Sequence, residues 1–162
     1  MSRTIRTGVK IGAIIIVAVA CIALAYYIGS GLTGHKLATL SDNMNYSRWQ
    51  DKYYKVTCLA GAISGASTLG WFMSARYLLK ADEATGAGKR LIWLIWFGLS
   101  IAGSLAAAHF YSPQLGIRLN GIIYAVYGLI FSGLGYWLAT IATTPTVYKY
   151  TPIGARLLRR FL

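Results

Sequence analysis

The side chains of this chain that are best suited to catalysis or metal binding are few and widely separated. They comprise two histidines, His35 and His109, and four acidic residues. Two histidines could ligate haem or a metal, but neither belongs to an H-x-x-x-H pair or lies beside spaced cysteines. Nucleophile-elbow, Walker and dinucleotide motifs are absent. The sequence therefore predicts no catalytic residues, no metal site and no cofactor, and it favours ordinary interfacial histidines over a haem or metal site.

A stripe of small residues is the strongest pattern of contact-forming residues. Its spacings alternate between four and three, which gives a 3.5-residue period and keeps one seam of a helix facing a neighbour. The stripe consists of Gly121, Ala125, Gly128, Ser132, Gly135 and Ala139. A second segment carries Gly61 and Gly65 as a G-x-x-x-G motif. Such residues let helix backbones approach closely in lipid, so we expect these faces to pack inside one bundle. The alternative is that one seam packs on another protein.

The elements that must position these residues follow from the distribution of charge. Charged residues make up only 12% of the chain, against about 25% in soluble domains. Long stretches without Asp, Glu, Lys or Arg lie between Lys10 and Lys36, Lys55 and Arg76, Arg90 and Arg118, and Arg118 and Lys149. Each stretch can supply the roughly 20 apolar residues with which a helix crosses a bilayer. Helices that are buried in a soluble bundle would retain a charged face, which these stretches lack.

The predicted fold class is all-α, a four-helix transmembrane bundle that forms a single membrane domain over residues 1–162. The predicted spans are Val9–Ser30, Tyr53–Leu79, Leu91–Phe110 and Leu119–Ala142. Residues 31–52 are predicted to form an outer loop, with Ser47 as the N-cap of the second helix. All four acidic residues, Asp42, Asp51, Asp82 and Glu83, fall in predicted loops, and none lies deep in a span where it would mark an ion pathway.

Lys and Arg set the predicted orientation. They are more abundant in the N-terminus, the middle loop and the tail than in the two outer segments, so both termini are expected on the cytoplasmic or equivalent side. The membrane is predicted to be a bacterial cytoplasmic (inner) membrane or a mitochondrial inner membrane. The net charge of +12 is explained by this anchoring and by anionic headgroups. Nucleic acid is not an expected partner, because no basic domain is present to bind it.

The basic tail, residues 143–162, is predicted to end in a short amphipathic cationic helix. Thr151 is the expected N-cap and Pro152 the expected first helical residue. The apolar residues that follow share one helical face, and Arg156, Arg159 and Arg160 lie off it. Such a helix is suited to an anionic lipid surface or to a partner protein. The alternative is a frayed chain end.

Among known four-span families, the Tim17-like family, which includes an accessory subunit of mitochondrial complex I, comes nearest. The chain is similar to it in size, in the glycine-rich second span with Gly61, Gly65 and Gly70, and in the segment from Arg76 to Asp82. The Arg–Asp spacing differs from the family's, and no paired glycines follow. The similarity is one of composition over a minor part of the chain. It implies, as one alternative, an accessory subunit of a respiratory complex.

These patterns lead to three functional hypotheses. The first is a non-enzymatic structural or assembly subunit of a larger membrane complex, with other membrane subunits and anionic lipids as its partners. The second is a small homo-oligomeric channel, holin-like pore or transporter, whose path would be lined by Ser64, Thr68, Ser100, Ser104 and Ser132. The third is a membrane enzyme or redox carrier that uses His35 and His109. The small-residue seams and the lack of ionisable residues within the spans favour the first.

Overall fold

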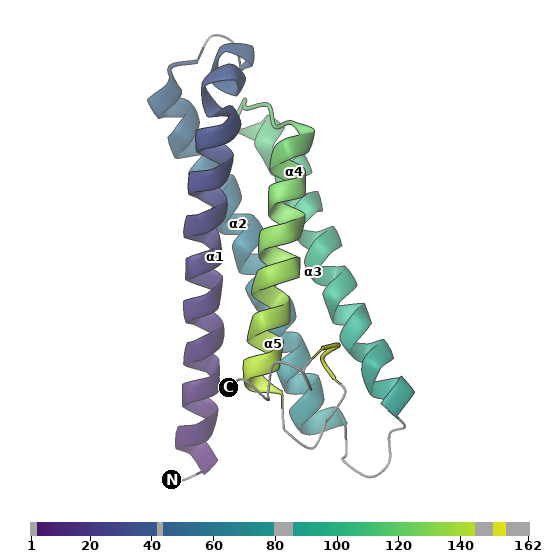
Figure 1. Cartoon of the computed structure of the whole chain (residues 1–162). Coiled ribbons are helices and arrows are strands. Elements are labelled where there is room, and N and C mark those ends of the chain that lie inside the picture. Colours follow the sequence, from purple (N-terminus) through teal and green to yellow (C-terminus); the bar gives the residue numbers. More distant parts are fainter. Residues whose placement is uncertain (1–2, 42–43, 80–85, 145–150, 155–162) are drawn as a thin grey trace.

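The computed structural model describes residues 3–41, 44–79, 86–144 and 151–154, and every regular element among them is helical. Four helical rods run alternately in opposite directions (Figure 1). The first rod is α1 (Arg3–Leu40), and the second joins α2 (Tyr46–Met73) to η1 (Ser74–Leu78). The third is α3 (Gly86–Gln114). The fourth is a continuous series of α4 (Gly121–Tyr127), η2 (Gly128–Tyr136) and α5 (Trp137–Thr143). The predicted all-α four-helix bundle is confirmed.

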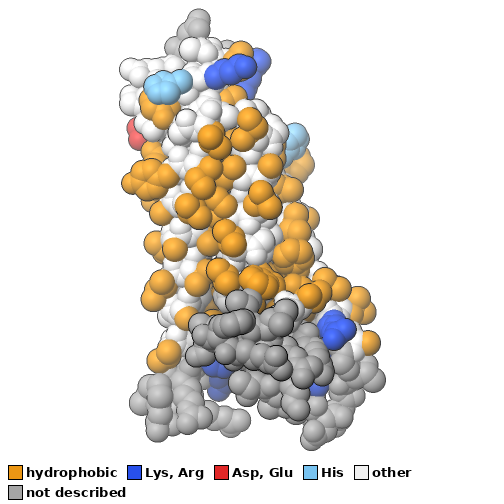
Figure 2. Space-filling model, in the orientation of Figure 1, with side chains coloured by type: hydrophobic (Ala, Val, Ile, Leu, Met, Phe, Trp, Pro, Cys, Tyr) orange, Lys and Arg blue, Asp and Glu red, His pale blue; other side chains and the backbone are white. Residues whose placement is uncertain are grey.

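All four rods are long and apolar enough to cross a membrane, over Thr7–Leu40, Tyr46–Leu78, Ala87–Gln114 and Gly121–Thr143. Large apolar side chains lie on their outer surface; Ile16 is 70% exposed and Leu129 is 69% exposed. Figure 2 shows these side chains along the middle of the bundle, with Lys and Arg side chains toward its ends. Such a surface is compatible with lipid rather than water, and it indicates an integral membrane protein.

The helices extend beyond the predicted spans, and the prediction of a loop over residues 31–52 is wrong for most of that range. α1 continues to Leu40, and α2 already begins at Tyr46. The extension is stabilised because Leu37 and Ala38 are buried in one cluster with Trp49. The N-cap of α2 is Asn45, not Ser47: the Asn45 side chain accepts a hydrogen bond from the Ser47 backbone N–H at 3.2 Å.

α2 occupies the centre of the bundle and contacts each of the other three rods. Toward the end remote from the N-terminus, it contributes to a core cluster of large buried residues that includes Trp49, Tyr53, Tyr127 and Phe131. Toward the other end, Trp71 packs in a cluster with Trp93 and Tyr136. The two aromatic clusters hold the helices in register along the bundle axis, and the small residues of neighbouring helices pack between the clusters.

The middle of the fourth rod, η2, is π-helical. A π-helix closes its hydrogen bonds from residue i to i+5, so each residue turns through a smaller angle than in an α-helix. The buried side chains of η2 include Phe131, Ser132 and Tyr136. A seam with a 3.5-residue period therefore cannot stay on one face along this rod.

The predicted start of the C-terminal helix is also wrong, because residues 152–154 form a bend and a turn. Gly154 has a φ of +81°, in the left-handed region that interrupts a right-handed helix. The Trp137 indole N–H donates to the carbonyl oxygen of Ile153 at 2.8 Å, which fastens this turn to α5. The remainder of the predicted helix, with Arg156, Arg159 and Arg160, lies outside the described residues.

Candidate functional site

Gly61 lies where α2 meets both α1 and η2. A Cβ atom at this position would lie 2.3 Å from Ile22 Cγ1 and 3.1 Å from Phe131 Cε1. Both distances are shorter than an ordinary carbon–carbon contact, so the close approach of three helices here requires glycine. Gly65, one turn further along, is different, because a Cβ there would lie 3.6 Å from the Ala18 Cβ, which is an ordinary contact.

The second half of the small-residue stripe also lies inside the bundle. Ser132 is fully buried, and Ala139 packs in a cluster with Ile14. Gly135 lies against α1, because a Cβ at this position would be 3.1 Å from Cys21 Sγ. These residues bring the fourth rod close to its neighbours.

The first half of the stripe contacts no neighbouring rod through its side-chain positions. A Cβ at Gly121 or Gly128 would meet no atom within 4 Å, and Ala125 is exposed. Among the residues that the structure describes, the predicted continuous seam is therefore not met. The physical reason is the change from α- to π-helical winding at Gly128, which turns the later half of the stripe into the bundle and leaves the earlier half outside.

Three serines form a hydrogen-bonded row across the interior of the bundle. Ser64 Oγ donates to the Phe131 carbonyl oxygen at 2.8 Å, and its single proton is then used. Ser100 must therefore donate to Ser64, at 3.0 Å, and Ser132 to Ser100, at 3.3 Å. The hydroxyls join α2, α3 and η2, and all three serines are buried.

The other two hydroxyl groups of the hypothetical pore lining, those of Ser104 and Thr68, also form hydrogen bonds inside the bundle. Ser104 Oγ of α3 donates to the Ala60 carbonyl oxygen of α2 at 3.0 Å. Thr68 Oγ1 donates to the Ser64 carbonyl oxygen of its own helix at 3.0 Å. Both side chains are buried. A hydroxyl that pairs across helices, as that of Ser104 does, holds membrane helices together.

His35, one of the two candidate metal ligands, is the first ring of an aromatic row. Its ring stacks on Tyr46 with 3.8 Å between centroids, and the row continues through Trp49, Tyr53 and Tyr127 at 6.4, 4.8 and 6.1 Å. Sequence reasoning missed this row. The helical spacing of Tyr46, Trp49 and Tyr53 is the signal that could have indicated a shared face.

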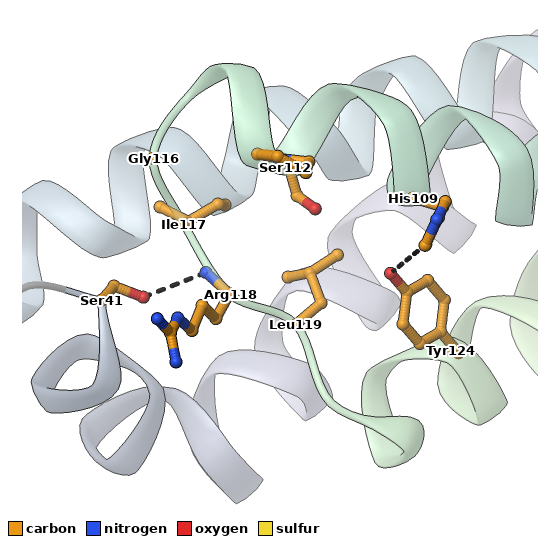
Figure 3. Close-up of a pocket in the computed structure, with 9 residues that line it drawn as sticks. Ser41, His109, Ser112, Gly116, Ile117, Arg118, Leu119 and Tyr124 are labelled. Carbon is orange, nitrogen blue, oxygen red and sulfur yellow. Dashed lines mark hydrogen bonds between the residues drawn. The ribbon is translucent and has the colours of Figure 1, made fainter.

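A cavity of about 390 Å³, drawn in Figure 3, lies where α1 ends and the fourth rod begins, remote from the N-terminus (Figure 1). Its lining comes from the end of α3, the connection to α4, the start of the fourth rod and the end of the first. The residues are Ser41, His109, Ser112, Pro113, Gly116, Ile117, Arg118, Leu119 and Tyr124. The Arg118 backbone N–H donates to Ser41 Oγ at 3.0 Å, which fixes the connection against the end of α1. Sequence reasoning missed the cavity.

The two histidines have different neighbours. His109 Nδ1 lies 3.4 Å from the Tyr124 hydroxyl, whereas His35 is stacked on Tyr46. Within the described ranges, no group of three His, Cys, Asp or Glu residues could hold a metal ion. Asp51 is exposed, and the other three acidic residues lie outside the described residues.

Comparison of the chain with protein-family models, with curated proteins and with solved structures finds no match. The similarity to the Tim17-like family therefore stays one of composition. What the described residues can do chemically follows from their geometry alone. The buried small residues and hydroxyls hold helices together, the outer half of the stripe offers a free helix face, and the cavity offers polar groups.

Proposed function

We propose that this protein is a non-enzymatic structural or assembly subunit of a larger membrane complex and acts by helix packing. The supporting observation is the free half of the small-residue stripe. Gly121, Ala125 and Gly128 share one face at the start of the fourth rod, because they are spaced by four and three residues. Space is open around this face within the described chain.

In lipid, such a face can serve as a contact surface for another helix. The hydrophobic effect does not drive helices together inside a bilayer, so association there depends on van der Waals contact and hydrogen bonds. A strip of Gly and Ala lets a second backbone approach closely, whereas flexible acyl chains fill it less well. We therefore propose a transmembrane helix of another subunit as its partner. A second copy of this chain, giving a homo-oligomer, is the competing occupant.

The finer topology is part of the same proposal. Both termini would lie on the cytoplasmic or equivalent side of a bacterial or mitochondrial inner membrane, with Arg156, Arg159 and Arg160 against anionic lipid headgroups. Basic residues already gather near the N-terminal end of the described bundle. Lys10 Nζ donates to the Thr143 carbonyl oxygen at 2.9 Å, and Arg76 donates to Thr7 Oγ1 at 2.6 Å.

The test is affinity purification of the tagged protein, at its natural expression level, in a mild detergent. Among the described residues, no neighbouring atom lies within 4 Å of a Cβ added at position 121 or 128, so a bulky side chain there points into open space. We expect Gly121→Leu and Gly128→Leu to reduce the yield of a stoichiometric partner about tenfold or more, because the partner helix can no longer approach. Helicity and melting temperature should stay at wild-type values.

Gly98→Leu is the matched control. Gly98 lies on α3, is exposed, and also has no atom within 4 Å of an added Cβ. This variant should keep the partner. The proposal is overturned if the wild-type protein purifies alone as a monodisperse monomer, or if all three variants keep the partner at the wild-type ratio. If the Gly121→Leu and Gly128→Leu variants lose only a second copy of this chain that carries a different tag, the face is assigned to a homo-oligomer.

The geometry favours this role over a channel. The five hydroxyl side chains that would line a pore are all buried and hydrogen-bonded within helix interfaces. A homo-oligomeric path would need such groups on an outward face. Ion flux through the purified protein in liposomes, with sensitivity to a bulky residue at Ser100, would favour the channel instead.

A further inference from the structure

The cavity shown in Figure 3 carries positive charge, and none of the described residues that line it is acidic. Arg118 is exposed at its wall, and within the described chain its guanidinium forms no ion pair or hydrogen bond. A second cation lies close by, because the Lys52 Nζ atom is 3.9 Å from the Cβ position of Gly116. Clustered cations at a partly enclosed surface attract anions.

A serine at the cavity wall offers a further hydrogen-bond donor. Ser112 lines the cavity and is only 3% exposed, yet its hydroxyl forms no hydrogen bond with any residue that the structure describes. Buried polar side chains normally have a partner. The neighbouring Ser41 hydroxyl is already satisfied, since it donates to the Leu37 carbonyl oxygen at 2.7 Å and accepts from the Arg118 N–H. Ser112 is thus the available donor inside the cavity.

The remaining wall is apolar. Pro113, Ile117 and Leu119 line the cavity beside the Tyr124 ring. Close to it, Phe110 is 69% exposed, with its ring centroid 5.3 Å from that of His109. A ligand that fills this space would combine an anionic group with an apolar part.

We propose that this cavity binds a phosphate group, with Arg118 and Ser112 as its principal donors. A guanidinium presents two parallel N–H donors to two phosphate oxygens, and a hydroxyl adds a third bond. The Lys52 ammonium group adds charge at the Gly116 side, and the His109 ring lies on the Tyr124 side. The volume of about 390 Å³ lies in the range of small-ligand sites, roughly 300–1,000 Å³. The phosphate group can belong to an anionic lipid headgroup or to a free phosphate.

Titration calorimetry of the purified full chain in a neutral detergent tests the proposal. The probes are short-chain phosphatidylglycerol and inorganic phosphate. We expect one saturable site that Arg118→Ala weakens about tenfold or more and Ser112→Ala weakens several-fold, whereas Arg118→Lys retains part of the affinity. Arg48→Ala is the matched control, since it removes an exposed charge outside the cavity lining and should leave binding unchanged.

The two probes separate the sources of the phosphate. Binding of the lipid alone assigns the site to a headgroup whose acyl part contacts the apolar wall, and binding of both probes assigns it to phosphate as such. Melting temperatures without ligand verify that each variant folds. The proposal is overturned if neither probe binds saturably, or if Arg118→Ala and Ser112→Ala both bind like the wild-type protein. Equal losses of affinity in Arg118→Ala and Arg48→Ala would also overturn the proposal. They would show that the probe is attracted only by the net charge of the protein.

Discussion

A methyl group at position 61 would collide with two helices, whereas the same group at position 65 would fit. We therefore expect Gly61→Ala to lower the free energy of unfolding by about 1–3 kcal/mol, as overpacking does. Gly65→Ala should leave it unchanged or raise it by up to about 1 kcal/mol, because alanine favours the helix. Thermal unfolding of the detergent-solubilised variants measures both effects.

Ile22 provides the control for the clash at Gly61. Its Cγ1 and Cδ1 atoms are 2.3 and 2.8 Å from the hypothetical Cβ. Ile22→Ala removes both atoms, so Gly61→Ala should cost less in that background than in the wild-type protein. Equal costs in the two backgrounds, or equal effects of the substitutions at 61 and 65, would contradict the assigned contacts.

At the residue scale, the sequence predicts which positions are small or hydroxyl-bearing but not which way they face. The G-x-x-x-G spacing of Gly61 and Gly65 indicates a close helix contact, and the structure brings both glycines against α1. Ser100 could equally have lined a pore, because a hydroxyl in a lipid-spanning helix is compatible with either role. Its hydrogen bond to Ser64 places the Ser100 side chain in the interface between α3 and α2.

The fourth rod shows what one π-helical segment does to an element. A π-helical turn contains an additional residue relative to an α-helical turn, so removal of one residue there can be absorbed by a return to i→i+4 bonding. Deletion of the exposed Leu129 in η2 should therefore cost little, about 1–2 kcal/mol. Deletion of the exposed Leu138 in α5 should cost more, because the following residues would rotate by about 100°.

Two contacts report on that rotation. The Trp93 indole N–H donates to Thr140 Oγ1 at 3.1 Å, and the Lys10 ammonium group donates to the Thr143 carbonyl oxygen at 2.9 Å. Both should be lost when Leu138 is deleted and kept when Leu129 is deleted. Unfolding temperature and tryptophan fluorescence of the two deletions make the comparison. If the two deletions destabilise the protein equally, η2 does not absorb the loss of a residue by returning to i→i+4 bonding.

At the element scale, the 3.5-residue stripe correctly indicates a helix, but not how the helix is wound. Residue types do not encode whether a backbone N–H bonds four or five residues back. That choice is made by tertiary partners: Tyr127 donates to Thr57 Oγ1 on α2 at 2.8 Å, and Tyr136 donates to the Trp93 carbonyl oxygen on α3 at 3.0 Å. The free face at Gly121 and Gly128 was therefore not predictable from the spacing alone.

For the whole molecule, the end of α1 at Leu40 and the connection 115–120 should lie on one side of the membrane, and the start of α1 on the other. In a variant that lacks Cys21 and Cys58, a membrane-impermeant maleimide should label Thr39→Cys and Gln114→Cys from the outer side. A cysteine that is added before Met1 should react only after the membrane is opened. Thr39 and Gln114 are both exposed. Labelling of these two positions from opposite sides would contradict the four-span topology.

At this scale, the fold was predictable because lipid imposes a simple rule: a stretch without charge and of sufficient length becomes a helix. The helix ends were less predictable, since Leu37 and Ala38 extend α1 through contacts with Trp49. The cavity was not predictable at all. Ser41, Ser112 and Arg118 belong to three segments that only the folded connections bring together.

The row of serines has a consequence for how a dry interior accommodates polar groups. Its hydroxyl protons all point the same way, from Ser132 through Ser100 to Ser64, and the last one is given to the peptide oxygen of Phe131. Each hydroxyl proton of the row thus has an acceptor inside the bundle. Polar groups can therefore lie within a hydrocarbon layer without water to solvate them.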